Sequence, residues 1–278
     1  MAIEVLSELL RFAPDVYGLR WDNHVAMFTV TPEGVLLVDP CGEGNANTPS
    51  LLKSAIRSVT DQPVRYVVYS HSAWDHSMGG IVFADTAQFV SQTRARDRMA
   101  AVGEPLSPVA DITFEDTLTL ELGGRRWDLY ASKLTPVDDY IILHDPAARL
   151  LMYVDCFQPS SIPLPLHGLP ADLQKRIDWL RTFDFDLLLT GHATPRTFLT
   201  KEELQAQSDY LTDLVAAIER AEKAGCAPKS PEMTAFVLAA LDARWTGWRR
   251  YPERVGAHIA NCFDYAEGVY PAPLAPRR

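Results

Sequence analysis

Apolar and polar positions alternate with a period of two along several short stretches of the chain, and this is the pattern of β-strands. The stretches are bounded by Gly, Pro or Asp, as strands and hairpins usually are. The predicted strands and hairpins are residues 63–70, residues 87–92, a hairpin over residues 117–132 that turns at Gly123-Gly124, and a hairpin over residues 139–155 that turns at Asp145-Pro146.

Other stretches carry apolar residues at helical spacing. Thr200 and Glu203 form a capping box, which predicts a helix from there to about residue 223. The other predicted helices are a short amphipathic helix within residues 1–16 and helices over residues 48–60, 232–244 and 252–265. The Arg-rich residues 92–101 fit a helix or a loop with a solvated face, and the proline-rich residues 158–170 fit neither a helix nor a strand. Because hairpins alternate with helices, we expect two β layers flanked by helices.

Composition narrows the class of protein. The chain has 278 residues, of which 47% are hydrophobic and 22% charged, as in an ordinary globular enzyme of one large domain with an appendage. The net charge of −10 disfavours a nucleic-acid partner, because phosphate binding requires a basic surface. A small molecule, neutral or modestly charged, is the expected partner.

The location of the protein is also an expectation from the sequence. No apolar run reaches the length of a membrane span, and the first sixteen residues lack the charge and apolar pattern of a secretory signal. The cysteines are far apart and form no CxxC pair, which favours reduced thiols in the cytoplasm. They are Cys41, Cys156, Cys226 and Cys262.

A cluster of potential metal ligands follows the strand predicted for residues 63–70. His71, Asp75 and His76 lie within the six residues HSAWDH. The carboxyl end of such a strand is where open α/β sheets place their active sites. The simpler alternative is a strand-to-helix loop with an Asp cap and two incidental histidines.

The cluster resembles the metallo-β-lactamase superfamily, whose signature is His-x-His-x-Asp-His followed by two small residues. His71, Asp75, His76 and the pair Gly79-Gly80 match this signature, but Ala73 stands at the position of the second His. Further matches are an opening hairpin over residues 25–40 with Asp39 at its end, the strand-end residue Asp155, and the late His192; Leu134 replaces a loop His. The resemblance implies a four-layer αββα sandwich, an α/β fold, over residues 1–199 and a C-terminal helical extension over residues 200–278.

In the family, two metal ions are bound at neighbouring sites. The resemblance implies that the two sites keep different numbers of their ligands in this chain. The first site keeps only His71, because Ala73 and Leu134 offer no donor atom. The second site keeps all of its ligands, which are Asp75, His76, Asp155 and His192. One imidazole cannot hold a divalent ion against water, whereas two imidazoles and two carboxylates can. We therefore predict one divalent ion, for which Zn²⁺ fits best and Fe or Mn also fit.

Several neighbours of this site have two interpretations. His71, without a metal to bind, is a general base, a hydrogen-bonding partner of a substrate oxygen or a structural residue. Asp75 is a second candidate base. Ala73 and Leu134 predict an apolar pocket where the first ion would lie. Core packing is favoured over substrate stacking for Trp74. His167, together with Ile162 and Leu164, lies in a loop that would overhang the metal; loop packing is favoured for His167 over a role as an extra ligand.

The predicted function is a metal-dependent hydrolase of a small ester, lactone, thioester or amide-like substrate. Four protein ligands leave room for water only if the ion becomes five-coordinate or one carboxylate loosens. The alternatives are a non-hydrolytic metalloenzyme, such as a lyase, isomerase or decarboxylase, and a degenerate binding protein or pseudoenzyme. A homodimer is a further hypothesis. Core packing is favoured for a group of C-terminal aromatic residues, and the alternatives are a pocket wall or a dimer interface. This group is Trp245, Trp248, Tyr251 and Phe263.

Overall fold

Two β-sheets face each other in the computed structural model, which describes residues 7–21, 23–41, 48–132, 138–192 and 196–264. The first sheet has the order β1-β2-β3-β4-β5-β6-β7, antiparallel up to β4 and parallel after it. Its strands are β1 (Ser7–Ala13), β2 (Val16–Trp21), β3 (His24–Thr31), β4 (Gly34–Val38), β5 (Val64–Val68), β6 (Gln88–Gln92) and β7 (Ile112–Phe114).

The second sheet has the order β13-β12-β11-β10-β9-β8. All of its pairs are antiparallel except β11 with β12, which run parallel. Its strands are β8 (Thr117–Leu122), β9 (Arg125–Ala131), β10 (Ile141–Asp145), β11 (Leu150–Met152), β12 (Leu187–Leu189) and β13 (Phe198–Leu199). The parallel pair matters for function, because it delivers two chain segments to the same edge of the sheet.

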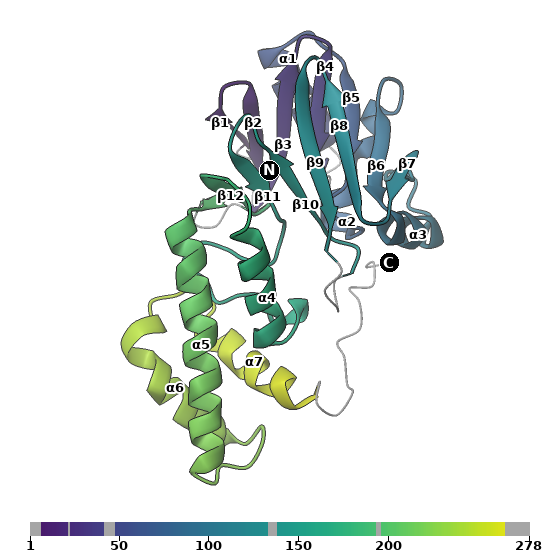
Figure 1. Cartoon of the computed structure of the whole chain (residues 1–278). Coiled ribbons are helices and arrows are strands. Elements are labelled where there is room, and N and C mark those ends of the chain that lie inside the picture. The colour runs from purple at the N-terminus through teal and green to yellow at the C-terminus, as the bar shows by residue number, and fades with distance from the viewer. Residues whose placement is uncertain (1–6, 22, 42–47, 133–137, 193–195, 265–278) are drawn as a thin grey trace, which may run out of the picture.

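Helices pack against the outer face of the first sheet and against the part of the second sheet from β10 to β13 (Figure 1). The helices are α1 (Thr48–Val59), α2 (Trp74–Ser77), α3 (Thr93–Val102), α4 (Pro170–Leu180), α5 (Lys201–Lys223), α6 (Pro231–Trp245) and α7 (Glu253–Asp264), with short 3₁₀ turns at Gly80–Phe83 and Pro165–His167. The order of layers is helix, sheet, sheet, helix. This confirms the predicted αββα sandwich with a helical C-terminal region.

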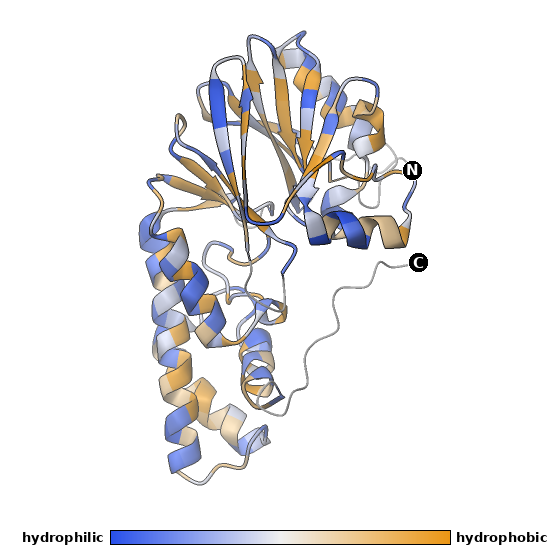
Figure 2. Ribbon diagram, turned by 45° about the vertical axis from the view of Figure 1, so that its right-hand side comes forward, coloured by the Kyte–Doolittle hydropathy of each residue, from blue (hydrophilic) through white to orange (hydrophobic). Residues whose placement is uncertain are grey.

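Three apolar clusters correspond to the three interfaces between these layers. The cluster between the sheets combines residues of both, such as Met27 and Val68 from the first and Trp127 and Leu143 from the second. A second cluster joins the outer face of the first sheet to α1 and α3, and a third joins the second sheet to α4 and the C-terminal helices. Figure 2 shows the hydrophobic residues concentrated on the strands and on single faces of the helices. Burial of these faces stabilises the layered arrangement.

One predicted element is wrong. The chain near the N-terminus forms the edge strand β1 instead of the expected amphipathic helix, and it pairs with β2 from Ser7 opposite Trp21 to Ala13 opposite Val16. The spacing of Leu9 and Leu10 fits one face of a helix, but β2 offers a row of unpaired backbone groups that a strand can satisfy. Tertiary pairing therefore overrides the local pattern. The other predicted hairpins and helices are confirmed, and residues 92–101 are helical.

Helix α5 begins at the predicted capping box. The Thr200 hydroxyl accepts a hydrogen bond from the Glu203 amide, and the Glu203 carboxylate accepts one from the Thr200 amide. We expect Thr200→Ala to lower the free energy of unfolding by about 1 kcal/mol. A chemical denaturation curve should show this as a lower midpoint with an unchanged slope, and Thr212→Ala within the same helix serves as the comparison. A midpoint unchanged relative to wild type would contradict a stabilising cap.

The C-terminal helices pack on the second sheet and hold the proline-rich loop. Arg254 donates to the Ile162 carbonyl, His258 to the Pro163 carbonyl and Asn261 to the Pro165 carbonyl. The four aromatic residues Trp245, Trp248, Tyr251 and Phe263 all pack in the third apolar cluster, so core packing is confirmed for them.

Within the described residues no helix is both long and apolar enough to cross a bilayer, and all four cysteines are free thiols. The division at residue 199 stays a prediction.

Candidate metal centre

Polar side chains from both sheets meet at one edge of the sandwich. The first sheet contributes His71, in the loop after β5, and Asp75 and His76, in the short helix α2 that follows this loop. Asp155 and His192 come after the parallel strands β11 and β12 of the second sheet. A hydrogen bond from the Ile141 amide to the Ser70 carbonyl ties the two sheets together beside this point. The topology thus brings together residues that are more than a hundred positions apart.

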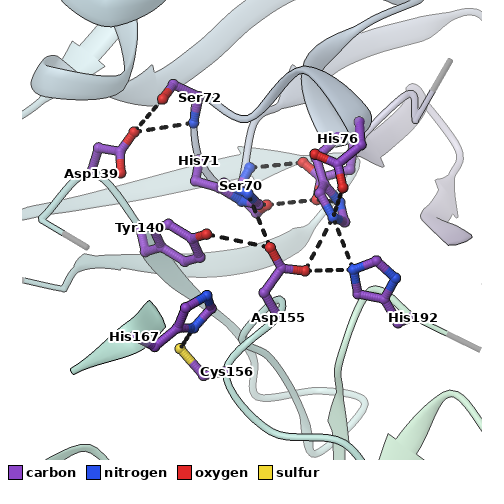
Figure 3. A network of polar contacts seen from close by, with 12 residues as sticks. Ser70, His71, Ser72, His76, Asp139, Tyr140, Asp155, Cys156, His167 and His192 are labelled. Atoms are coloured by element: carbon purple, nitrogen blue, oxygen red, sulfur yellow. Dashed lines mark hydrogen bonds and ion pairs between the residues drawn. The ribbon is translucent and has the colours of Figure 1, made fainter. Parts of the chain in front are cut away.

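Asp155 lies at the centre of this group (Figure 3). Its Oδ1 is 2.6 Å from His192 Nε2 and 3.2 Å from His76 Nε2, and its Oδ2 is 3.2 Å from His71 Nε2. Tyr140 donates its hydroxyl to Oδ2 at 3.3 Å. Asp155 has a φ of 69°, in the left-handed region that Asp tolerates better than most residues. Backbone strain of this kind is typical of functional sites.

Asp75 approaches the same centre from the other side. Its Oδ2 is 3.5 Å from His76 Nε2, and His76 Nε2 is 3.4 Å from His192 Nε2. The four residues that the resemblance assigned to the second metal site, Asp75, His76, Asp155 and His192, are therefore close neighbours in space. His71 belongs to the same group, since its imidazole is buried and stacks on Tyr140 with ring centres 4.0 Å apart.

Each of the three histidines around Asp155 has a hydrogen-bond acceptor near Nδ1, the ring nitrogen that points away from Asp155. His76 Nδ1 is 3.2 Å from Asp39 Oδ2, and His192 Nδ1 is 3.0 Å from the Asn23 carbonyl oxygen. His71 Nδ1 is 2.8 Å from Ser70 Oγ, and that hydroxyl donates in turn to Asp39 at 2.6 Å. A proton on each Nδ1 leaves the lone pair of Nε2 directed inward, which is the arrangement that supports metal-binding histidines. The inner nitrogens and the carboxylates present acceptors to one another, and such a set requires protons or a cation between its members.

The charges of the site fit a cation as well. Burial alone would raise the pKa of Asp155, but the imidazoles of His76 and His192 hold it well below its usual value. Burial would also raise the pKa of Asp75, yet the hydrogen bond from His24 and the charge of His76 lower it to about 2. Conversely, burial opposes protonation of His76, and the carboxylates of Asp155, Asp39 and Asp75 raise its pKa well above normal. The carboxylates therefore stay ionised and favour positive charge between them, and the residues present fit a divalent ion.

Sequence reasoning missed His24. This residue begins β3, and its Nε2 lies 3.4 Å from Asp75 Oδ2. An isolated β-bridge pairs His24 with His192, and the Val25 amide donates to the Gly191 carbonyl at 2.9 Å. A histidine at the start of a strand carries no motif, so only the pairing of distant segments could reveal it.

A second residue outside the predicted site holds the motif loop. Asp139 is buried and accepts hydrogen bonds from the Ser72 amide and hydroxyl, and Arg98 of α3 pairs with it at 2.8 Å. Burial would raise the pKa of Asp139, but His71, Ser72 and Arg98 lower it. Arg98 thus has a structural partner beyond the solvated face predicted for its segment.

The other predicted pocket residues have different outcomes. Ala73 is partly exposed at the residue before α2, and Trp74 is also partly exposed and absent from the apolar clusters, which contradicts its predicted core packing. Leu134 lies outside the described residues. His167 is fully buried with Nδ1 2.8 Å from Cys156 Sγ, and burial lowers its pKa to about 3. Loop packing is therefore the better interpretation of His167, and its partner Cys156 is a buried free thiol.

Comparison with protein families gives a match over residues 19–192, which span both sheets and the whole polar centre. The chain belongs to the metallo-β-lactamase superfamily. No curated protein matches the chain in a sequence comparison. The family assignment confirms the resemblance that the motifs indicated.

Solved structures extend the likeness to the helical region. A metallo-β-lactamase from Pontibacter korlensis, 18% identical, covers 75% of this chain and 100% of its own, with a TM-score of 0.62. The metallo-β-lactamase IND-7, 14% identical, covers 76% of this chain and 100% of its own, with a TM-score of 0.61. The stereoselective inverting sec-alkylsulfatase Pisa1 from Pseudomonas sp., 15% identical, covers 98% of this chain with a TM-score of 0.75, whereas this chain covers 52% of the sulfatase. The sulfatase therefore shares the fold of nearly the whole chain, C-terminal helices included.

Proposed function

We propose that the protein is a metal-dependent hydrolase of a small ester, lactone, thioester or amide-like substrate, with one divalent ion held among Asp75, His76, Asp155 and His192. The observation that carries this proposal is the convergence of their donor atoms, each imidazole being oriented by an acceptor at its outer nitrogen. Superfamily membership supports hydrolysis. Zn²⁺ is the expected ion, because nitrogen and oxygen donors without thiolate suit it, and Fe or Mn would also fit.

The catalytic chemistry is divided between the ion and the protein. A divalent ion bound here lowers the pKa of water and polarises a carbonyl oxygen. His71 is the better candidate for general base, because Ser70 accepts its Nδ1 proton and leaves Nε2 able to accept another. Asp75 is less suited, since its Oδ2 is engaged by His24 and its low pKa makes it a weak base. The Tyr140 hydroxyl donates to Asp155 Oδ2, the carboxylate oxygen that also lies next to His71.

The metal content of the purified protein tests this proposal. We expect close to one ion per chain by elemental analysis, and turnover of at least one ester, lactone, thioester or sulfate ester in a substrate panel. Sulfate esters are included because of the structural likeness to an alkylsulfatase. Turnover of none of these by metal-loaded protein would favour a lyase, isomerase or decarboxylase. Absence of metal would favour a degenerate binding protein, and two ions per chain would contradict the single site.

Removal of the ion should also lower thermal stability. An ion that binds only the folded chain stabilises it by about 2.7 kcal/mol when its concentration is a hundred times its Kd. We therefore expect chelation to lower the Tm by roughly 5–10 °C, and readdition of Zn²⁺ to restore it. Differential scanning fluorimetry with and without chelator measures this. An identical Tm in both would count against a metal bound by the native fold.

The cellular location and the assembly of the protein are part of the same proposal. Its four free, widely separated cysteines favour a reducing compartment such as the cytoplasm. The homodimer suggested by the C-terminal aromatic residues has lost that support, because these side chains pack within one chain. Light scattering of the purified protein would decide between monomer and dimer.

A further inference from the structure

The four donor atoms of His24, Asp75, His76 and His192 all lie within 4.8 Å of one another. Consecutive atoms in this group are separated by similar distances: 3.4 Å from His24 Nε2 to Asp75 Oδ2, 3.5 Å from there to His76 Nε2, and 3.4 Å from there to His192 Nε2. Donors bonded to one tetrahedral ion at about 2.1 Å are about 3.4 Å apart. These three spacings match those of ligands that share an ion, and the remaining pairs lie within 4.8 Å.

Asp155 lies 3.2 Å from His76 Nε2, close to the spacings of this group, but its distance to His192 differs. Its Oδ1 is 2.6 Å from His192 Nε2, which is a hydrogen-bond distance and too short for two corners of the same tetrahedron. Its Oδ2 lies toward His71 and Tyr140. His24 therefore fits the tetrahedral set better than Asp155 does.

The backbone holds His24 in this position. The bridge between His24 and His192 joins the start of β3 to the loop after β12. The ring of His24 lies 4.9 Å from that of His192 and 5.6 Å from that of His76, centre to centre. Both lost donors, at Ala73 and Leu134, belonged to the first ion of the family, whereas His24 lies beside the second.

We propose that His24, which none of the family motifs includes, is a ligand of the single ion together with Asp75, His76 and His192, and that Asp155 is an additional, more loosely held carboxylate. This inference rests on the proposed function. With His24 bound, four protein ligands remain even when Asp155 moves away, so water would join the ion as a fifth ligand in the place of Asp155.

The competing interpretation is that His24 only orients Asp75 by a hydrogen bond. X-ray absorption spectroscopy of the Zn²⁺-loaded protein separates the two, because it counts imidazole ligands. We expect three imidazoles in the wild-type protein and two in His24→Ala, with the Kd for Zn²⁺ weakened more than about 100-fold in a chelator competition. A support residue typically costs 10- to 100-fold. Three imidazoles in His24→Ala would overturn the proposal, whatever the affinity.

Matched variants sharpen this test. His24→Gln keeps a donor for Asp75 but replaces the imidazole, so we expect it to lose the same imidazole and to bind as weakly as His24→Ala; wild-type affinity in His24→Gln would overturn the proposal. His71→Ala should keep three imidazoles, as should His144→Ala on β10, whose ring contacts the Asp184 carbonyl away from the site. Circular dichroism confirms that each variant is folded.

The outcomes separate this inference from the proposed function. A wild-type chain that holds one ion through two imidazoles, with His24→Ala unchanged, overturns the role of His24 and leaves the metal-dependent hydrolase in place. A wild-type chain that binds no ion overturns both. Loss of an imidazole in both His24 variants, but in neither control, supports the assignment.

Discussion

Replacement of His192 by alanine is expected to abolish metal binding and hydrolysis together. His192 Nε2 lies 2.6 Å from Asp155 and 3.4 Å from His76, at the point where the two sheets meet. Without this imidazole the remaining donors come mainly from the first sheet, and the affinity should fall by more than about 100-fold, beyond the range for a residue that only supports a ligand. Elemental analysis after dialysis, together with the rate on the best substrate of the panel, measures both effects.

The control for this variant is His144→Ala. His144 is also in the second sheet, but it is a strand residue whose Nε2 meets a backbone carbonyl. We expect its metal content and rate to equal those of the wild-type protein. A His192→Ala protein that keeps one tightly bound ion would show that the ion lies elsewhere and would remove the basis of the proposed site.

Replacement of Asp39 by alanine should weaken both the metal site and the fold. Asp39 is completely buried and accepts hydrogen bonds from the Ser70 amide at 2.8 Å, from the Ser70 hydroxyl at 2.6 Å, and from His76 Nδ1 at 3.2 Å. Each buried donor left without an acceptor costs about 1–3 kcal/mol. The loss of the acceptor that orients His76 should weaken metal binding by about 10- to 100-fold.

The matched control for Asp39 is Asp128→Ala on β9. Asp128 is another buried carboxylate that accepts hydrogen bonds from a hydroxyl and an arginine, Thr119 and Arg126, but it is not part of the metal site. We expect Asp128→Ala to lower stability and to leave the Kd for Zn²⁺ unchanged. Denaturation in the presence of chelator gives the free energy of unfolding without the contribution of the bound ion. Titration with Zn²⁺ gives the affinity. Equal affinities in Asp39→Ala and wild type would contradict the support role of Asp39.

Local pattern was sufficient for most of the fold. The hairpin that turns at Gly123 and Gly124 and the capping box at Thr200 were predicted correctly, because turn chemistry and caps are decided within a few residues. The N-terminal segment failed for the opposite reason. Its apolar spacing suits a helix, but pairing with β2 lies outside the information in the segment itself.

The sequence alone indicated the family and five residues of the polar centre. His71, Asp75, His76, Asp155 and His192 occur in motifs with a fixed order. Only the tertiary structure added His24 and Asp139, and only it showed the contact of Asp39 with His76 and that of His167 with Cys156. The physical reason is that a sequence motif contains only residues close together in the chain, on one strand and the loop that follows it. Contacts between the start of β3 and the loop after β12 form only when the two sheets pack, and no short-range signal in the chain encodes them.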